Sequence, residues 1–191
     1  MNLVKKFFRN INRLRHSHGF GVHSTYAYRF VENVIRPKCY GYYAYDILDA
    51  DPSLTPRIAA KAKWLVRIAV FLETKRFVIL QPPCPDSFHS SLMAASKAMK
   101  MSKKEISNTA SYIPKPGDFV IVSGSRFIPS SNHGIDKFFE AGIPLLAIAP
   151  DKVLRQAMNA PRPYGLLLKD TSKMLLIPRK EMAYTAYDIK F

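Results

Sequence analysis

The densest group of reactive side chains in this sequence is a six-residue segment, Asp86-Ser87-Phe88-His89-Ser90-Ser91. An acid, an imidazole and hydroxyls are the components of a nucleophilic triad. Successive residues of one helix point in different directions, however, so closeness in sequence does not amount to triad geometry. The simpler interpretation is that Asp86 or Ser87 caps the amino end of a helix.

The loop before this segment carries prolines where a nucleotide-binding α/β protein would be expected to have glycines. An apolar strand, Phe77-Val78-Ile79-Leu80-Gln81, leads directly into Pro82-Pro83-Cys84-Pro85. Glycines at such a place let an anionic ligand approach the backbone and its N–H groups. Proline has no N–H and a fixed φ, so this loop predicts the architecture of a cofactor-binding fold without its usual cofactor loop.

Other groups of polar residues have simple structural interpretations. Ser123 and Gly124 end an apolar strand, where open α/β sheets bind ligands, but the GxSxG pattern of a hydrolase is absent. The stretch 132–136 contains a histidine and an acid and reads equally well as a turn before a helix. The two cysteines, Cys39 and Cys84, have no CxxC spacing, so we predict neither a disulfide framework nor a zinc site, and a reduced cytoplasmic setting.

The metal-site interpretation is also weak for the histidines near the N-terminus. His16, His18 and His23 lie on a turn that contains two glycines, without a fixed i, i+4 pair and without a nearby carboxylate. The preceding residues 1–15 carry five basic and no acidic side chains at the spacing of an amphipathic helix. Such a helix either attaches to an anionic surface or partner, or packs on its own domain, and we favour the second.

These segments must be positioned by alternating helices and strands. The hydrophobic pattern predicts helices over 25–35, 55–73, 86–99, 132–141 and 151–158, and strands over 77–81, 119–123, 145–149, 164–169, 174–178 and 183–191. Alternation followed by local strand pairing favours a three-layer, Rossmann-like α/β sheet, mostly parallel, with an antiparallel C-terminal edge strand. We expect a helical N-terminal appendage over 1–50 and a shortened α/β domain over 51–191.

The chain is strongly basic, with 29 Lys and Arg against 14 Asp and Glu among 191 residues, a formal net charge of +15. Such an excess makes nucleic acid or an anionic surface a partner to consider. The basic residues are spread over both halves, which does not indicate a dedicated basic domain. Tyr40, Tyr42, Tyr43 and Tyr45 could stack on bases, although packing of a linker is the favoured interpretation. No apolar stretch reaches the length of a membrane span.

Several segments resemble a bacterial group of class I S-adenosylmethionine-dependent methyltransferases. The N-terminal stretch 19–30, Gly-Phe-Gly-Val-His-Ser-Thr-Tyr-Ala-Tyr-Arg-Phe, and the later Tyr-Tyr-Ala-Tyr at 42–45 are similar to that group's N-terminal signature. Residues 118–124 resemble its fourth strand, and residues 164–191 resemble its terminal β-hairpin, whose last strand pairs antiparallel. The resemblance implies a Rossmann-like fold with a cofactor pocket at Gln81, Cys84, Asp86, Ser123 and Gly124.

The departures from the family fall where its chemistry takes place. The segment 81–87 contains no glycine, and Ser123 stands where the family has an acid. Only residues 100–117 separate the helix from the next strand, so the family's second strand, with its ribose-binding acid, and its third strand are both expected to be missing. We therefore expect a methyltransferase-like domain that has lost S-adenosylmethionine chemistry, binds no cofactor and serves as a binding or interaction module, a pseudoenzyme.

Two alternatives stay open at this point. One is an active S-adenosylmethionine-dependent methyltransferase whose loop holds the cofactor in an atypical way. The other is a nucleic-acid-binding protein that uses its charge and its tyrosines. A parallel sheet lacking two strands would also expose an unpaired edge, which predicts a homodimer formed through that edge.

Overall fold

The computed structural model describes residues 10–11, 14–16, 18–19, 21–37, 41–81, 84–107, 112–123 and 134–191. Within these residues the chain forms one seven-stranded sheet in the spatial order β2-β1-β3-β4-β6-β5-β7. The strands are β1 (Arg76–Leu80), β2 (Ser102–Ile106), β3 (Asp118–Ser123), β4 (Leu145–Ile148), β5 (Leu166–Lys169), β6 (Lys173–Ile177) and β7 (Thr185–Asp188). The sheet is mixed but mostly parallel, and it is Rossmann-like in character.

One strand of the sheet runs against the others. β1 pairs in parallel with both β2 and β3, and β3 pairs in parallel with β4. β6 is antiparallel to β4 and to β5, whereas β7 is parallel to β5. The predicted antiparallel edge strand is therefore wrong in its position: the antiparallel strand is β6, inside the sheet, and the edge strand β7 runs parallel. The tight turn at 170–172 forces β6 back along β5, and the following segment then places β7 on the far side of β5.

The sequence reasoning also missed β2, which it placed in a polar connection lacking strands. β2 pairs with β1 from Arg76↔Ser102 to Leu80↔Ile106. Four of its five residues are exposed and only Ile106 is buried, so no apolar alternation marks it as a strand. The described residues between β2 and β3 contain no further strand. As an edge strand with Lys103 and Lys104 exposed, β2 carries charges that disfavour strand addition, and the dimer across this edge stays a prediction.

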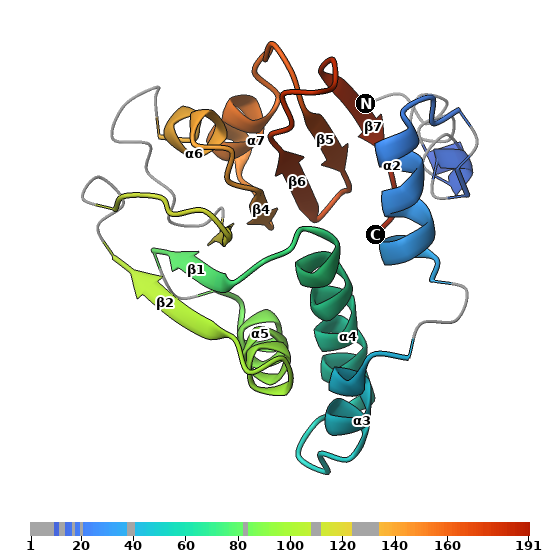
Figure 1. Ribbon diagram of the computed structural model, residues 1–191, viewed down its shortest axis with the longest axis vertical. Coiled ribbons are helices and arrows are strands. Elements are labelled where there is room, and N and C mark those ends of the chain that lie inside the picture. The colour runs from blue at the N-terminus through green and yellow to red at the C-terminus, as the bar shows by residue number, and fades with distance from the viewer. Residues whose placement is uncertain are drawn as a thin grey trace.

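Helices cover both faces of the sheet, as Figure 1 shows. The first face is covered by α2 (Thr25–Phe30), a π-helical turn η1 (Val31–Ile35), α3 (Tyr43–Asp49), α4 (Pro56–Phe71) and α5 (Asp86–Ala98), and the second by α6 (Asp136–Glu140) and α7 (Lys152–Met158). Side chains of β1 alternate between the two cores: Phe77 and Ile79 join the first, Val78 and Leu80 the second. This alternation follows from the period of two in a strand.

Short polar side chains begin three of the helices. Ser24 accepts a hydrogen bond from the N–H of Ala27, and Thr55 accepts one from the N–H of Ile58, before the proline that starts α4. Asp151 caps α7 in the same way. These contacts satisfy N–H groups that a helix leaves unpaired at its amino end. α5 begins at Asp86 as expected, but its N-cap is Pro85, so the prediction of a capping side chain from Asp86 or Ser87 is wrong.

The N-terminal elements share the core of the sheet. Buried side chains of α2, η1 and α3 belong to the same apolar cluster as β1, β3 and β5. Near the other edge, α2 lies beside β7 (Figure 1), and the N–H of His23 donates to the Tyr187 hydroxyl at 3.2 Å. Most of the predicted basic helix over 1–15 lies outside the described residues. No helix in the described part of the chain is long and apolar enough to cross a membrane.

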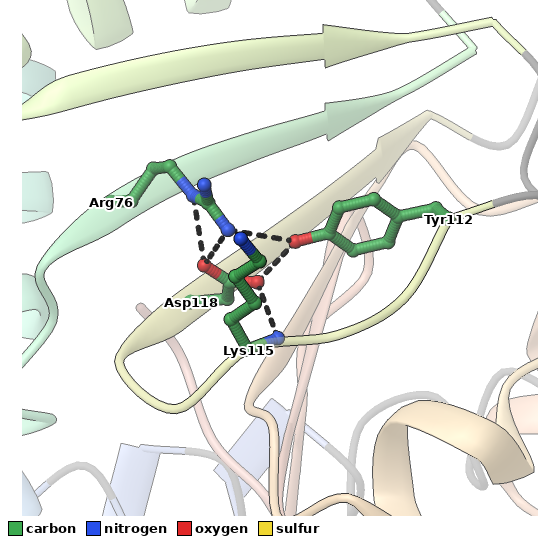
Figure 2. A network of polar contacts seen from close by, with 4 residues as sticks. All are labelled: Arg76, Tyr112, Lys115 and Asp118. Carbon is green, nitrogen blue, oxygen red and sulfur yellow. Dashed lines mark hydrogen bonds and ion pairs between the residues drawn. The ribbon is translucent and has the colours of Figure 1, made fainter.

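The amino end of the sheet is held by one buried polar cluster, shown in Figure 2. Arg76 at the start of β1 donates to Oδ1 of Asp118 at the start of β3, through Nε at 2.9 Å and Nη2 at 2.7 Å. The Tyr112 hydroxyl and the backbone N–H of Lys115, at 2.8 Å, donate to the other carboxylate oxygen. Asp118 is 3% exposed. A buried charge is tolerated when it is paired and hydrogen-bonded, and here both oxygens are.

This cluster fixes the connection that leads from β2 into β3. Burial, and next the hydrogen bond to Asp118, raise the pKa of Tyr112 to about 12, because both favour the protonated phenol. The Gly117 carbonyl accepts from the N–H groups of Lys75 and Arg76, at 2.7 and 3.2 Å. Gly117 has φ +84°, and a Cβ there would come within 2.9 Å of the Lys75 side chain. Strand entry at this end is thus fixed by paired charges and backbone contacts.

Candidate functional site

The order of the strands predicts a crevice for a ligand at the carboxyl ends of β1 and β3, the switch point of the sheet. α5 follows β1 and packs on the first face of the sheet, whereas α6 follows β3 and packs on the second. Connections that leave neighbouring parallel strands in opposite directions open a gap between them, and open α/β sheets bind ligands there. The predicted site residues Gln81 and Ser123 directly follow the paired residues Leu80 and Val122 at this edge.

Gln81 adopts an unusual backbone conformation at the end of β1. Its φ is +52°, in the left-handed region that glycine enters without strain and other residues enter at a cost. Its N–H donates to the carbonyl of Ile106 at 2.7 Å, which ties the end of β1 to the end of β2. Its side-chain Oε1 is buried, with no partner in the described part of the chain. The backbone thus has the conformation of a glycine turn, while a side chain occupies the space that glycine would leave open.

Cys84 and Glu105 interact at this same end of the sheet. Cys84 is 3% exposed, and burial, with a smaller contribution from the charge of Glu105, raises the pKa of its thiol to about 11. The thiol is therefore protonated near neutral pH and a poor nucleophile. Glu105 pairs in register with Ile79 and forms an ion pair with Lys103 at 3.3 Å. Sequence reasoning missed Glu105 because it missed β2.

The remaining predicted residues lie in different environments. Ser123 is buried at the end of β3, with 3% exposure, whereas Asp86 is exposed at the start of α5. Gly124 lies outside the described residues. In the reactive-looking segment, Ser90 and Ser91 donate to backbone carbonyls of α5, at 2.9 and 2.7 Å. No hydrogen bond among the described residues joins His89 to a serine or an acid, so the segment does not form a triad.

A pocket of about 500 Å³ opens at the same end of the sheet, on its first face. Residues from α4, the start of α5, the end of β4 and the start of β6 form its walls. Its lining consists of Arg57, Ala60, Lys61, Trp64, Pro85, Ser87, Phe88, Ile148, Ala149, Ser172, Lys173 and Phe191. We call this the α4–β6 pocket. Three of its lining residues are cationic, three are aromatic and none is acidic.

The polar and aromatic groups of the α4–β6 pocket contact one another. The rings of Trp64 and Phe191 stack at 5.9 Å between centroids, with 27° between their planes. Lys173 Nζ lies 5.6 Å from the centroid of each ring. Lys61 Nζ donates to the Ser87 hydroxyl at 3.0 Å, which joins α4 to the start of α5. The pocket wall is therefore an apolar surface bordered by ammonium and guanidinium groups.

The sequence reasoning did not identify this pocket, although part of its signal was present. Arg57, Lys61 and Trp64 stand at positions i, i+4 and i+7 and share one face of α4. The helix over 55–73 was predicted from its apolar periodicity alone, although two cations and an aromatic residue on one helical face form a recognisable pattern. Lys173 and Phe191 come from distant segments, and only the sheet topology brings them to α4.

The histidines have structural contacts instead of a shared ligand. His16 Nδ1 lies 2.9 Å from the carbonyl oxygen of Asp188, and Arg36 donates to His18 Nδ1 at 2.6 Å. A search of the described residues finds no group of three histidine, cysteine or acidic side chains that could hold a metal ion.

The tyrosines are divided between packing and solvent. Tyr42 and Tyr45 pack edge to face at 5.2 Å, and the Tyr45 hydroxyl donates to the Lys63 carbonyl at 3.4 Å. Tyr43 is 75% exposed, whereas Tyr40 lies outside the described residues. The described tyrosines therefore do not form one stacking surface.

Comparison with protein-family models, with curated proteins and with solved structures found no significant match to this chain. A functional assignment therefore rests on the sequence, the fold and the site geometry. They show a mixed, mostly parallel α/β sheet of Rossmann-like character.

Proposed function

We propose that this chain is a methyltransferase-like domain that has lost S-adenosylmethionine chemistry and acts as a binding or interaction module. The observation that carries the proposal is the end of β1. Gln81 keeps a left-handed φ of +52° but fills the glycine position with a side chain whose Oε1 is buried. The loop that follows contains prolines at 82, 83 and 85, which cannot donate backbone hydrogen bonds to a cofactor.

Two further features support the loss of chemistry. Ser123, a buried hydroxyl, ends β3 where the resemblance implies an acid. Cys84, the one thiol close to the crevice in the described chain, is kept protonated by a pKa raised to about 11. Neither group supplies a carboxylate or a thiolate nucleophile at neutral pH. An interaction module needs only the pocket and the surface, which the fold retains.

Thermal unfolding with S-adenosylmethionine and S-adenosylhomocysteine tests this proposal. A ligand at about a hundred times its dissociation constant adds roughly 2.7 kcal/mol, which is a shift of about 5 to 10 °C for a chain of this size. We expect no shift with either ligand at millimolar concentration. A saturable shift with both would overturn the proposal.

The presence of β2 favours one second candidate, an active methyltransferase with an atypical cofactor loop. The resemblance implies an acid near the end of the strand beside β1, and Glu105 is the penultimate residue of β2. The charge of Glu105 contributes to the raised pKa of Cys84, which places the Glu105 carboxylate near the end of β1. On this candidate, Glu105 would accept hydrogen bonds from the ribose hydroxyls of the cofactor.

The two candidates differ in the response of one variant. If the active enzyme is correct, Glu105→Gln removes most of the cofactor-induced thermal shift, while Lys103→Gln, which changes the other member of the same ion pair, preserves it. If the binding module is correct, no cofactor shift exists in the unmodified chain or in either variant. Transfer of a labelled methyl group to any acceptor would support the active enzyme.

A further inference from the structure

We propose that the α4–β6 pocket binds a small phosphorylated ligand with a planar ring, of the mononucleotide class. This inference rests on the proposed function, because it names the ligand class of the binding module. The charge of the pocket, its aromatic wall and its size support this ligand class.

The charge of the pocket favours an anion with more than one negative charge. Arg57, Lys61 and Lys173 line it, and no acidic residue does. Lys173 also contacts Asp170 at 3.7 Å, so its charge is partly balanced, while Lys61 contacts the neutral Ser87 hydroxyl. Arg57 is exposed, and its guanidinium forms no hydrogen bond or ion pair within the described chain. A phosphate monoester carries a charge of about −1.5 to −2 at neutral pH and suits this set of donors.

The apolar wall favours a flat ring beside the phosphate. Trp64 and Phe191 form one stacked surface, and the largely buried Phe88 extends it. Aromatic side chains stack on nucleobases with little dependence on base identity, because each base has a π-face. Lys173 Nζ lies over both rings, so the cationic and aromatic parts of the pocket are adjacent. A ligand with both a ring and a phosphate could therefore use both parts at once.

The size of the pocket fits a single small molecule. Its volume of about 500 Å³ lies within the range of about 300 to 1,000 Å³ typical of small-molecule sites. A second cavity of about 550 Å³, near Arg155 and Lys169, also contains Asp170 and Asp188 and no aromatic residue. Because it carries both signs of charge, it shows no comparable preference for an anion, and the α4–β6 pocket is the better candidate.

Trp64 makes the proposal directly measurable, since it is the single tryptophan of the chain. We would titrate the full chain with adenosine monophosphate and follow tryptophan fluorescence, with adenosine and inorganic phosphate as separate probes. The expected result is a saturable change with adenosine monophosphate, binding at least about tenfold weaker for adenosine, and competition by phosphate. The comparison of adenosine monophosphate with adenosine measures the contribution of the phosphate. Inorganic phosphate alone shows binding without the ring.

Charge variants of Arg57, which is exposed, and of Lys61, which is half-buried, test the pocket without changing a residue of the apolar core. Arg57→Gln with Lys61→Gln should weaken adenosine monophosphate binding about tenfold or more and leave adenosine binding unchanged. Lys97→Gln is the matched control, because Lys97 lies on α5, is 77% exposed and does not line the pocket. It should bind like the unmodified chain. Circular dichroism of each variant confirms that the fold is retained.

Three results would overturn the inference. They are the absence of a saturable fluorescence change with adenosine monophosphate, equal affinity for adenosine and its monophosphate, and a loss in Lys97→Gln equal to that in the pocket variants. None of them decides the proposed function, which is tested by the S-adenosylmethionine scan. If neither ligand binds, the mononucleotide inference fails while the loss of S-adenosylmethionine chemistry stands.

Discussion

The two ends of the sheet differ in how completely their buried polar groups are paired. At the amino end, Asp118 is buried and both of its carboxylate oxygens are hydrogen-bonded, one of them to Arg76. At the carboxyl end, the α4–β6 pocket gathers cations without an acid, and the Oε1 of Gln81 is buried without a described partner. Paired polar groups make the first end a structural support. The second end has a pocket lined by cations and no acid, so a bound anion would gain favourable charge interactions there.

The largest expected effect comes from removing the central acid of the amino end. Asp118→Ala leaves the partly buried Arg76 without its partner, and we expect a loss of about 3 kcal/mol in the free energy of unfolding. Urea denaturation measures it. The matched control is Asp49→Ala, which breaks an ion pair with Lys63 whose acid is 61% exposed, and which should cost less than about 1 kcal/mol. Equal losses in the two variants would remove the contrast between the ends.

Tyr112→Phe tests the same cluster more gently. It removes one hydrogen bond to a carboxylate and should cost about 1 to 2 kcal/mol at neutral pH. The folded pKa of about 12 lies above the usual value of 10.0, so the contribution of the phenol is complete below pH 10 and is lost as pH rises toward 12. The stability difference between the unmodified chain and the variant should shrink in that interval. A constant difference would show that the hydroxyl is not buried in this cluster.

Gln81→Gly tests whether the carboxyl end stores strain. Glycine accepts the left-handed φ and removes a buried amide oxygen, so we expect a gain of about 1 kcal/mol in the free energy of unfolding. Lys100→Gly, at the end of α5 with φ +54°, relieves a similar backbone conformation at an exposed position and should gain less. A net destabilisation in Gln81→Gly would mean that the side chain contributes more by packing than it costs.

The last prediction concerns reactivity and involves no change in stability: it is the reaction of Cys84 with a thiol reagent. With Cys39 replaced by serine, the native chain should react far more slowly than the urea-unfolded chain at neutral pH, because the thiol is buried and its pKa is raised to about 11. Absorbance of the released thiolate follows the reaction. Rapid labelling in the native state would reveal an open loop around Cys84.

Much of the architecture could be predicted from the sequence because buried elements carry strong periodic signals. The strand expected over 77–81 is β1, Arg76–Leu80, and the helix expected over 55–73 is α4, Pro56–Phe71. Both lie close to their expected bounds, since β1 is buried on both faces and α4 starts at Thr55-Pro56. The exposed β2 could not be predicted in this way, because its first four residues are all polar and no alternation of apolar and polar residues marks it as a strand. Its pairing depends on β1 and not on its own sequence pattern.

The candidate site was harder to predict, since its residues meet only through topology. Gln81 and Ser123 lie at neighbouring strand ends, because both follow clear apolar runs, while their role in a cofactor pocket stays a prediction. The position of β6 between β4 and β5 could not be inferred, because an interior and an edge antiparallel strand have the same local pattern. That position is what brings Lys173 to Trp64.

The interior position of β6 has a consequence for the order in which the chain can complete its sheet during synthesis. β4 is made before β5, yet the two are not neighbours, and β6 must pair with both before either edge is covered. Until residue 177 has left the ribosome, the apolar β4, Leu145–Ile148, keeps an uncovered edge. Nascent chains of this protein therefore pass through an interval in which the uncovered edge of β4 is exposed to aggregation, and that interval lasts until β6 is available to pair with it.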